Sequence, residues 1–167
     1  MSMRLNELID RWRADPAGTE RTLQVPVLVY EAAGVEQGDM WAATGSVVVG
    51  RRPHGHDPAI FFVEKRIGTQ NPFTMGVTIG RVENNDIAID DSSVSRFHAW
   101  LQHDERTKAW VLCDAESKNG TYLDGVELDA GQRKPLSDGS VIRLGNAYLR
   151  FLLPASVVGR LLLLAGA

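Results

Sequence analysis

From residue 76 to residue 154, apolar and polar side chains alternate in short runs separated by glycine, asparagine and aspartate. Alternation with a period of two is typical of β-strands, and Gly, Asn and Asp are residues that tight turns favour. The predicted strands cover residues 77–79, 87–89, 97–101, 110–114, 141–144 and 148–153. No helix-length pattern interrupts them. We therefore predict an all-β fold, a β-sandwich of two antiparallel sheets.

The strand predicted at residues 97–101 shows how the alternation assigns faces. Phe97, Ala99 and Leu101 should share one face of the sheet, and His98 and Trp100 should lie on the other. The last two predicted strands are joined by a Gly-Asn pair at residues 145–146, which is a turn signal, so we predict a terminal hairpin.

The N-terminal residues 1–15 follow a different period. Leu5, Leu8, Ile9 and Trp12 fall on one face at helical spacing, and the Asp-Pro pair at residues 15–16 should end the helix. We expect this short amphipathic helix to dock on the β-domain. The alternative is a helix that binds a partner.

The rest of the chain is less regular. Polar or Gly/Pro-rich segments predict loops at residues 17–24, 34–44 and 53–58, and apolar runs predict strands at residues 26–30, 45–51 and 60–66. The apolar residues 155–167 predict a short helix that covers a sheet edge or faces a partner. We expect an N-terminal extension (1–59), a β-domain (60–154) and an apolar tail (155–167).

Charge narrows the choice of partner. The 167 residues include 18 Lys and Arg against 21 Asp and Glu, a net charge of −3. Residues 76–154 keep this balance, with nine basic and twelve acidic residues. Nucleic-acid-binding domains carry a basic face or an elevated pI, so we expect no nucleic-acid partner. An anion would have to be bound by a few well-placed donors.

The number of cysteines and the length of the apolar runs indicate a cellular compartment. Cys113 is the single cysteine, so there is no internal disulfide, and this favours a reducing compartment. The first 16 residues lack the apolar run of a secretory signal, and the run at residues 161–165 is too short to span a bilayer. We expect a cytoplasmic protein without a membrane span.

Candidate chemistry lies in three polar loops between the predicted strands. Arg81 offers a planar fork of donors, Ser95 a hydroxyl, Lys118 a point charge, and Asn119 an amide that both donates and accepts. Phosphate presents three acceptor oxygens, so two or three such donors saturate it. The glycines at 80 and 120 let the backbone turn sharply beside these side chains. The sequence thus predicts a phosphate-binding site.

Five motifs in this order resemble the forkhead-associated (FHA) domain, a β-sandwich that reads phosphothreonine. They are Gly-Arg at 80–81, Asn-Asp-Ile at 85–87, SRFHA at 95–99, SKNGTYLDG at 117–125 and LSDGSVIRLG at 136–145. The resemblance covers residues 60–154 and implies a non-catalytic phosphothreonine-peptide-binding signalling adaptor without a cofactor. It implies as partner a phosphothreonine-containing protein, either a Ser/Thr kinase or its substrate.

The resemblance also implies roles for single residues. Arg81 and Ser95 would hold the phosphate, Arg96 would support it or contact the peptide backbone, and Asn119 would bond the peptide main chain. Lys118 stands where the family often has a small hydroxyl residue, and it could contact the phosphate by charge. Structural support would come from the buried His98, which braces the loops, and from the glycines Gly80 and Gly120.

Strand pairing raises a difficulty for this site. In a simple up-and-down sheet, the loop after Ile79 and the loop after Ile89 would lie at opposite ends. The strand between them would span about 10 Å, at about 3.3 Å per residue. Periodicity alone therefore does not bring the loops together, and their proximity is implied by the resemblance.

Two other functions fit parts of the sequence. A His/Asp hydrolase could use His98 or the loop at residues 54–57, but the sequence offers no nucleophile elbow and no P-loop. A structural oligomerisation domain could pack its terminal helices between subunits. His54, His56 and Asp57 could ligate zinc, yet no second ligand cluster accompanies them, so we expect no metal site.

Overall fold

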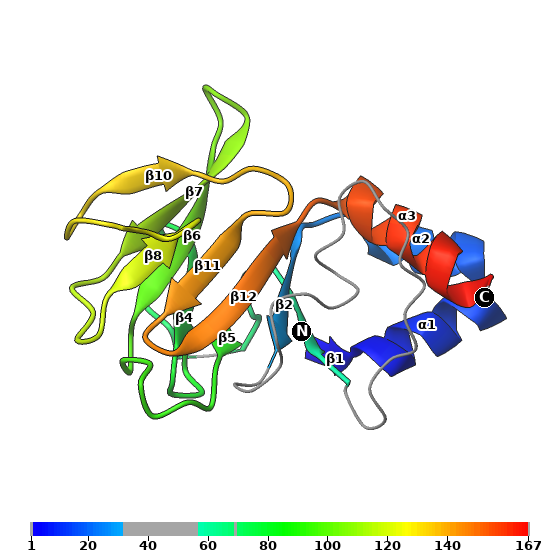
Figure 1. Cartoon of the computed structure of the whole chain (residues 1–167), viewed down its shortest axis with the longest axis horizontal. Coiled ribbons are helices and arrows are strands. Elements are labelled where there is room, and N and C mark those ends of the chain that lie inside the picture. Colours follow the sequence, from blue (N-terminus) through cyan, green and yellow to red (C-terminus); the bar gives the residue numbers. More distant parts are fainter. Residues whose placement is uncertain (1, 32–56, 69, 167) are drawn as a thin grey trace.

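The computed structural model describes residues 2–31, 57–68 and 70–166. Two β-sheets face each other, and three helices gather on one side of them (Figure 1). The expected strand at residues 45–51, the expected loop at 34–44 and the histidines His54 and His56 lie outside the described residues.

The strands of both sheets pair antiparallel, with a single exception among the described strands. One has seven strands in the order β1-β3-β2-β12-β11-β8-β9, and the other has five in the order β10-β7-β6-β4-β5. Among the described strands every pair is antiparallel except β4 with β5, which is parallel. The strands are β1 Ser2–Arg4, β2 Val27–Glu31, β3 Ala59–Phe62, β4 Val77–Gly80, β5 Ile87–Ala88, β6 Ala99–Asp104, β7 Ala109–Asp114, β8 Thr121–Leu123, β9 Val126–Glu127, β10 Arg133–Pro135, β11 Val141–Leu144 and β12 Ala147–Leu152.

The main core fills the space between the sheets. Alternate residues of facing strands contribute to it, among them Ile79 and Leu101 from the five-stranded sheet and Leu28, Ile142 and Phe151 from the seven-stranded sheet. All five are buried. These residues are the inward half of the period-two pattern of each strand.

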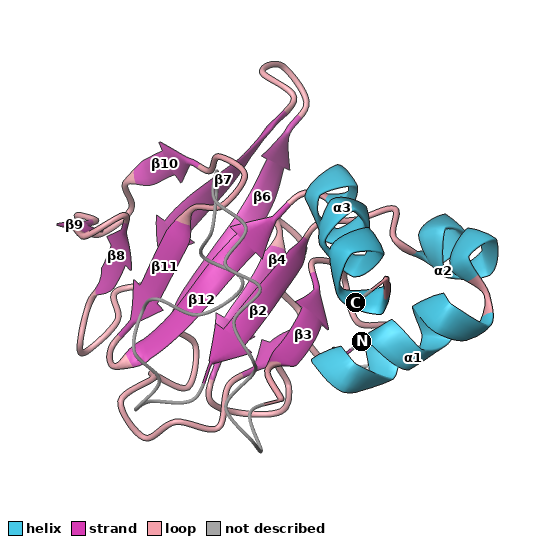
Figure 2. Ribbon diagram, turned by 45° about the vertical axis from the view of Figure 1, so that its right-hand side comes forward, coloured by secondary structure: helices cyan, strands magenta, loops and turns pink. Residues whose placement is uncertain are grey.

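A second apolar cluster joins the helices to the outer side of the seven-stranded sheet. The helices are α1 Leu5–Ala14, α2 Pro16–Thr22 and α3 Pro154–Ala165. Val27 and Val29 pack with helix residues such as Leu8 and Leu161, whereas Leu28 between them points into the main core. β2 is therefore buried on both faces, which explains its continuous apolar sequence. Figure 2 shows the helices beside the β2–β3 part of the sheet.

Most predicted elements are present. The β-sandwich and the terminal hairpin, now β11 and β12, are confirmed, as is the N-terminal helix with Leu5, Leu8, Ile9 and Trp12 buried. The C-terminal helix is also confirmed as α3. It packs against α1 and the outer side of the sheet through Leu161.

Three local predictions were wrong. Residues 17–24 were expected to form a loop, but Pro16–Thr22 is α2, because the Asp15 carboxylate caps it by accepting from Gly18 N at 2.9 Å. Residues 2–4 form β1 and not the first turn of a helix. Phe97 precedes β6 and is 39% exposed, so it does not share the buried face of Ala99.

The expected division into an extension, a β-domain and a tail stays a prediction. The boundary after residue 59 falls within β3, and β2 from the expected extension pairs with β12. The described part of the extension therefore contributes strands to the same sheet as the β-domain.

Candidate functional site

Parallel pairing of β4 with β5 brings the three polar loops to one end of the five-stranded sheet. Gly80 pairs with Ala88, and Ala99, at the start of β6, pairs with both Ile79 and Asp114. The ends of β4, β5 and β7 and the start of β6 therefore lie together. The structure does not have a simple up-and-down arrangement here, because the segment between β4 and β5 runs back along the sheet before β5 begins.

Gly80 allows two of these loops to touch. A Cβ atom at this position would lie 2.2 Å from the Arg96 carbonyl oxygen and 2.7 Å from Asn85 Nδ2. Asn85 uses that nitrogen to donate to the carbonyls of Val82 and Arg96, at 2.8 and 2.7 Å. A side chain at residue 80 would separate the loops, so glycine is required for close approach.

His98 ties the second loop to the third. It is completely buried, its Nδ1 accepts from the backbone N–H of Ser95 at 2.9 Å, and its Nε2 lies 3.0 Å from the Gly120 carbonyl oxygen. The ring is therefore neutral with its proton on Nε2, which donates to Gly120. Burial lowers the pKa of His98, against smaller raising effects from that carbonyl and from Asp114. Both ring nitrogens are engaged, so His98 offers no reactive group to a hydrolase.

Ser95 is held by its neighbours on both sides. Its carbonyl accepts from the backbone N–H of Arg81 at 2.9 Å, and its hydroxyl oxygen accepts from the backbone N–H of Lys118 at 3.0 Å. The third loop is braced in turn by the Asp114 carboxylate, which accepts from Ser117 and from the Thr121 hydroxyl. The backbone of all three loops is thus fixed around Ser95.

An open groove of about 1250 Å³ runs across these loops. Its charged lining consists of Arg81, Arg96, Lys118 and Glu116. Within the described part of the chain, the side chains of the three cations have no hydrogen-bond or ion-pair partner. The remaining lining residues are Asn71, Pro72, Phe73, Thr78, Val82, Asn84, Asn85, Ser95, Phe97 and Ala115. A locally cationic groove therefore lies on a chain whose net charge is negative.

The family model of the FHA domain matches residues 77–145, which include all three loops and His98. Residues 77–145 are therefore an FHA domain. The match confirms the family resemblance that the five sequence motifs carried.

Curated relatives agree with the FHA assignment and extend beyond this chain. An FHA domain-containing protein of Arabidopsis thaliana is 38% identical over 90 residues, which are 52% of this chain and 23% of that protein. The transcriptional regulatory protein EmbR of Mycobacterium tuberculosis is 28% identical over 156 residues, which are 91% of this chain and 39% of EmbR. The chain thus spans well under half the length of these relatives.

A solved structure supports the fold. An engineered FHA domain with a Myc-pTBD peptide has a TM-score of 0.51 at 19% identity, over 81% of this chain and 98% of that one. At this identity the likeness shows the β-sandwich alone. None of the described helices is long and apolar enough to cross a membrane.

The FHA groove brings together four of the five predicted ligand-binding residues. Arg81, Ser95, Arg96 and Lys118 line it, whereas Asn119 does not. Asn119 is exposed beside the groove, and its amide nitrogen donates to the Ser93 carbonyl at 2.8 Å. Gly120 adopts φ +82, a left-handed conformation that favours glycine. Their roles in ligand binding stay predictions.

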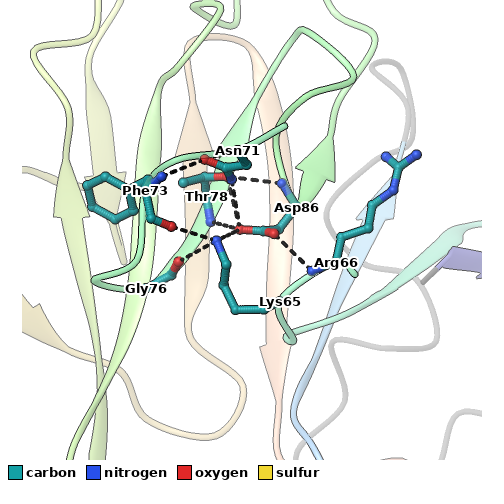
Figure 3. A network of polar contacts seen from close by, with 7 residues as sticks. All are labelled: Lys65, Arg66, Asn71, Phe73, Gly76, Thr78 and Asp86. Carbon is teal, nitrogen blue, oxygen red and sulfur yellow. Dashed lines mark hydrogen bonds and ion pairs between the residues drawn. The ribbon is translucent and has the colours of Figure 1, made fainter. Parts of the chain in front are cut away.

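Sequence reasoning missed a polar network at the edge of the groove (Figure 3). At its centre is the buried carboxylate of Asp86, which accepts from Lys65 Nζ at 2.7 Å, from the Arg66 backbone N–H at 2.9 Å and from the Thr78 backbone N–H at 2.8 Å. Asn71 donates to it at 3.2 Å. Its partners lie 8 to 21 positions away, which is why the sequence alone did not connect them.

The electrostatics of Asp86 follow from this network. Burial alone would raise the pKa of Asp86, but the hydrogen bonds from Lys65 and from the surrounding N–H and hydroxyl groups hold that pKa below its ordinary value. The carboxylate is therefore ionised at neutral pH and fixes the segment before β4. The one signal in the sequence for this buried carboxylate was the position of the aspartate directly before the buried Ile87.

Proposed function

We propose that this chain binds phosphothreonine peptides in the groove at the ends of β4, β5 and β7 and the start of β6, as a non-catalytic signalling adaptor. The observation that carries the proposal is the set of three exposed cations without partners among the described residues, Arg81, Arg96 and Lys118, around the anchored Ser95 hydroxyl. The groove offers a few placed donors and not an extended basic surface, as a single phosphate requires.

Each donor has a chemical task in the proposal. Arg81 presents its guanidinium to two phosphate oxygens at once, and Lys118 adds a single charge. The Ser95 hydroxyl oxygen already accepts from the backbone N–H of Lys118, so its proton is free to be donated to a phosphate oxygen. Arg96 supports the phosphate or contacts the peptide backbone.

Asn119 would act on the peptide main chain. Its amide nitrogen is held by the Ser93 carbonyl, which fixes the side chain and leaves the amide oxygen to accept a peptide N–H. The proposed partner is a protein that carries phosphothreonine, either a Ser/Thr kinase or one of its substrates.

A calorimetric titration with phosphothreonine-oriented degenerate peptides tests this function. We expect binding of the phosphothreonine pool, weaker binding of the matching phosphoserine pool, and no binding of the unphosphorylated threonine pool. The serine difference follows from the family resemblance, in which the threonine methyl group fills a small pocket. Equal binding of the phosphorylated and unphosphorylated pools would refute the proposal.

A further inference from the structure

Two phenylalanines line the same groove as the cations, and neither has a part in phosphate binding. Phe73 and Phe97 have ring centroids 5.4 Å apart, and Trp100 lies behind them at 5.4 Å from Phe73 and 6.1 Å from Phe97. Phe97 is 39% exposed. Single exposed apolar residues are ordinary on protein surfaces, but an aromatic cluster continuous with a binding groove indicates contact with a ligand.

The segment that carries Phe73 is held in place by the Asp86 network. The backbone N–H of Phe73 donates to Asn71 Oδ1 at 3.1 Å, and its carbonyl accepts from Lys65 Nζ at 2.8 Å. Asn71 and Lys65 both donate to the buried Asp86 carboxylate (Figure 3). Phe73 is therefore preorganised at the groove wall. Because this segment is already ordered, binding a ligand there costs less conformational entropy of the protein.

The cations and the two phenylalanines line the groove from several segments of the chain. The cations lie in the segments that follow β4 and β7 and in the loop before β6. Phe73 lies in the segment before β4, and Phe97 directly follows Arg96 in the loop before β6. An extended peptide advances about 3.3 Å per residue, so side chains within a few positions of a bound phosphate reach the neighbouring groove wall.

We propose that Phe73 and Phe97 form an apolar subsite that accepts an aliphatic or aromatic side chain near the phosphothreonine of the same peptide. This inference rests on the proposed function and adds the chemical class of the partner sequence. The occupant is a residue of the phosphopeptide, because the subsite and the cations share one groove and a phosphopeptide bound at the cations passes beside it.

The test compares the wild type with two matched variants in a phosphothreonine peptide library with degenerate flanking positions. Phe97→Ser removes a half-exposed ring from the subsite. Val126→Ser removes an apolar side chain that is 63% exposed on β9 and does not line the groove. We expect the wild type and Val126→Ser to enrich Leu, Ile, Met or Phe at one flanking position, and Phe97→Ser to lose that enrichment.

Single peptides then give the size of the effect. Exchanging the preferred residue for Ala should weaken wild-type binding about tenfold, because a partly buried aliphatic side chain is worth about half of its full transfer free energy. In Phe97→Ser the two peptides should bind nearly equally, while the requirement for phosphate persists. Melting curves for each variant show whether the fold is kept.

A local readout comes from Trp100. Its indole nitrogen is buried and has no hydrogen-bond partner in the described structure, and its ring packs against both phenylalanines. The indole N–H resonance, assigned with Trp100→Phe, should shift on titration with the apolar-flanked phosphopeptide and stay in place with the alanine-flanked one.

The outcomes separate the two proposals. Phosphothreonine binding without a flanking preference, or with a preference that Phe97→Ser retains, would refute the subsite and leave the proposed function intact. A wild type that binds no phosphothreonine peptide would refute both. Enrichment of acidic residues alone at the flanking positions would also refute the subsite.

Discussion

Arg81 combines a fixed backbone with an unengaged side chain. Its N–H donates to the Ser95 carbonyl at 2.9 Å, while its guanidinium is exposed in the groove and has no partner among the described residues. Its side chain can therefore be removed without loss of core volume or of an internal hydrogen bond. This separation of anchoring from ligand contact makes Arg81 the best residue for testing the site.

Arg81→Ala should weaken phosphothreonine-peptide binding by about tenfold to a hundredfold, since a charge-assisted hydrogen bond is worth about 1.5–3 kcal/mol. The melting temperature should stay close to that of the wild type. Arg81→Lys should recover only part of the affinity, because a point charge cannot form the bidentate fork. Calorimetric titration and a melting curve for each variant measure both effects.

Arg106→Ala is the matched control. Arg106 is an exposed arginine in the turn between β6 and β7, at the end of the sheet opposite the groove, so this variant loses the same charge elsewhere. It should bind like the wild type. If Arg81→Ala bound phosphopeptides as tightly as Arg106→Ala, the phosphate site would have to lie elsewhere on the protein.

At the residue scale, the sequence predicted side chains that carry distinctive chemistry and missed those that depend on tertiary partners. Arg81, Ser95, Arg96 and Lys118 could be predicted because they follow strand patterns within family-like motifs, and all four line the groove. Asp86 could not, because a carboxylate gains its role only from the partners that the fold brings to it. The exposure of Phe97 was missed because alternation was extended beyond the true start of β6.

Among the elements, the loops at the groove are connected through one buried ring. His98 links the loop of Ser95 to the loop of Gly120, and the pKa of His98 is lowered by burial. Protonation would remove the acceptor at Nδ1 and place a charge in the core. The unfolded chain therefore binds this proton more readily than the folded chain does, so acidification favours unfolding.

The sign of this linkage gives a prediction for pH. The contribution of neutral His98 to stability should be fully present above the ordinary histidine pKa of about 6.5 and should be lost as the pH falls from there toward the lowered folded pKa. Urea denaturation at pH 7.5 and 5.5 should show a larger loss of stability in the wild type than in His98→Gln. Asp86 titrates below its ordinary value near 4, outside this window. An equal loss in both proteins would show that His98 is not the group responsible.

The prediction of elements succeeded where the local sequence and the tertiary environment agreed. The hairpin of β11 and β12 follows from strict alternation around a turn, and α1 follows from its apolar face. The parallel pairing of β4 and β5 could not be predicted, because strand partners are chosen by the whole sheet and not by local periodicity. α2 could have been predicted, since an Asp-Pro pair is as much a helix start as a helix end.

At the scale of the whole molecule, the helices and the sandwich share a sheet. β2 buries one face in the main core and the other in the second apolar cluster, to which β3 adds Ile60 and Phe62 and β12 adds Leu152. α3 begins two residues after β12 ends. Among the described residues that line the groove, none belongs to a helix. We therefore expect the helices to contribute to the stability of the molecule without taking part in the binding of the phosphopeptide.

Two adjacent leucines of α3 test this expectation. Leu161 is 0% exposed in the second apolar cluster, whereas Leu162 is 60% exposed. Leu161→Ala should lower the free energy of unfolding by about 2–4 kcal/mol, from lost transfer free energy and the cavity left behind. Leu162→Ala should change it by less than about 0.5 kcal/mol.

Chemical denaturation followed by far-ultraviolet circular dichroism and by tryptophan fluorescence measures this difference. If the helices and the sandwich unfold as one unit, both probes should give a single coincident transition, and Leu161→Ala should move both midpoints together. Phosphopeptide affinity should be unchanged for both variants under conditions where they are folded, because the second cluster does not contact the groove. If Leu161→Ala and Leu162→Ala had the same small effect, α3 would not be docked on the sheet.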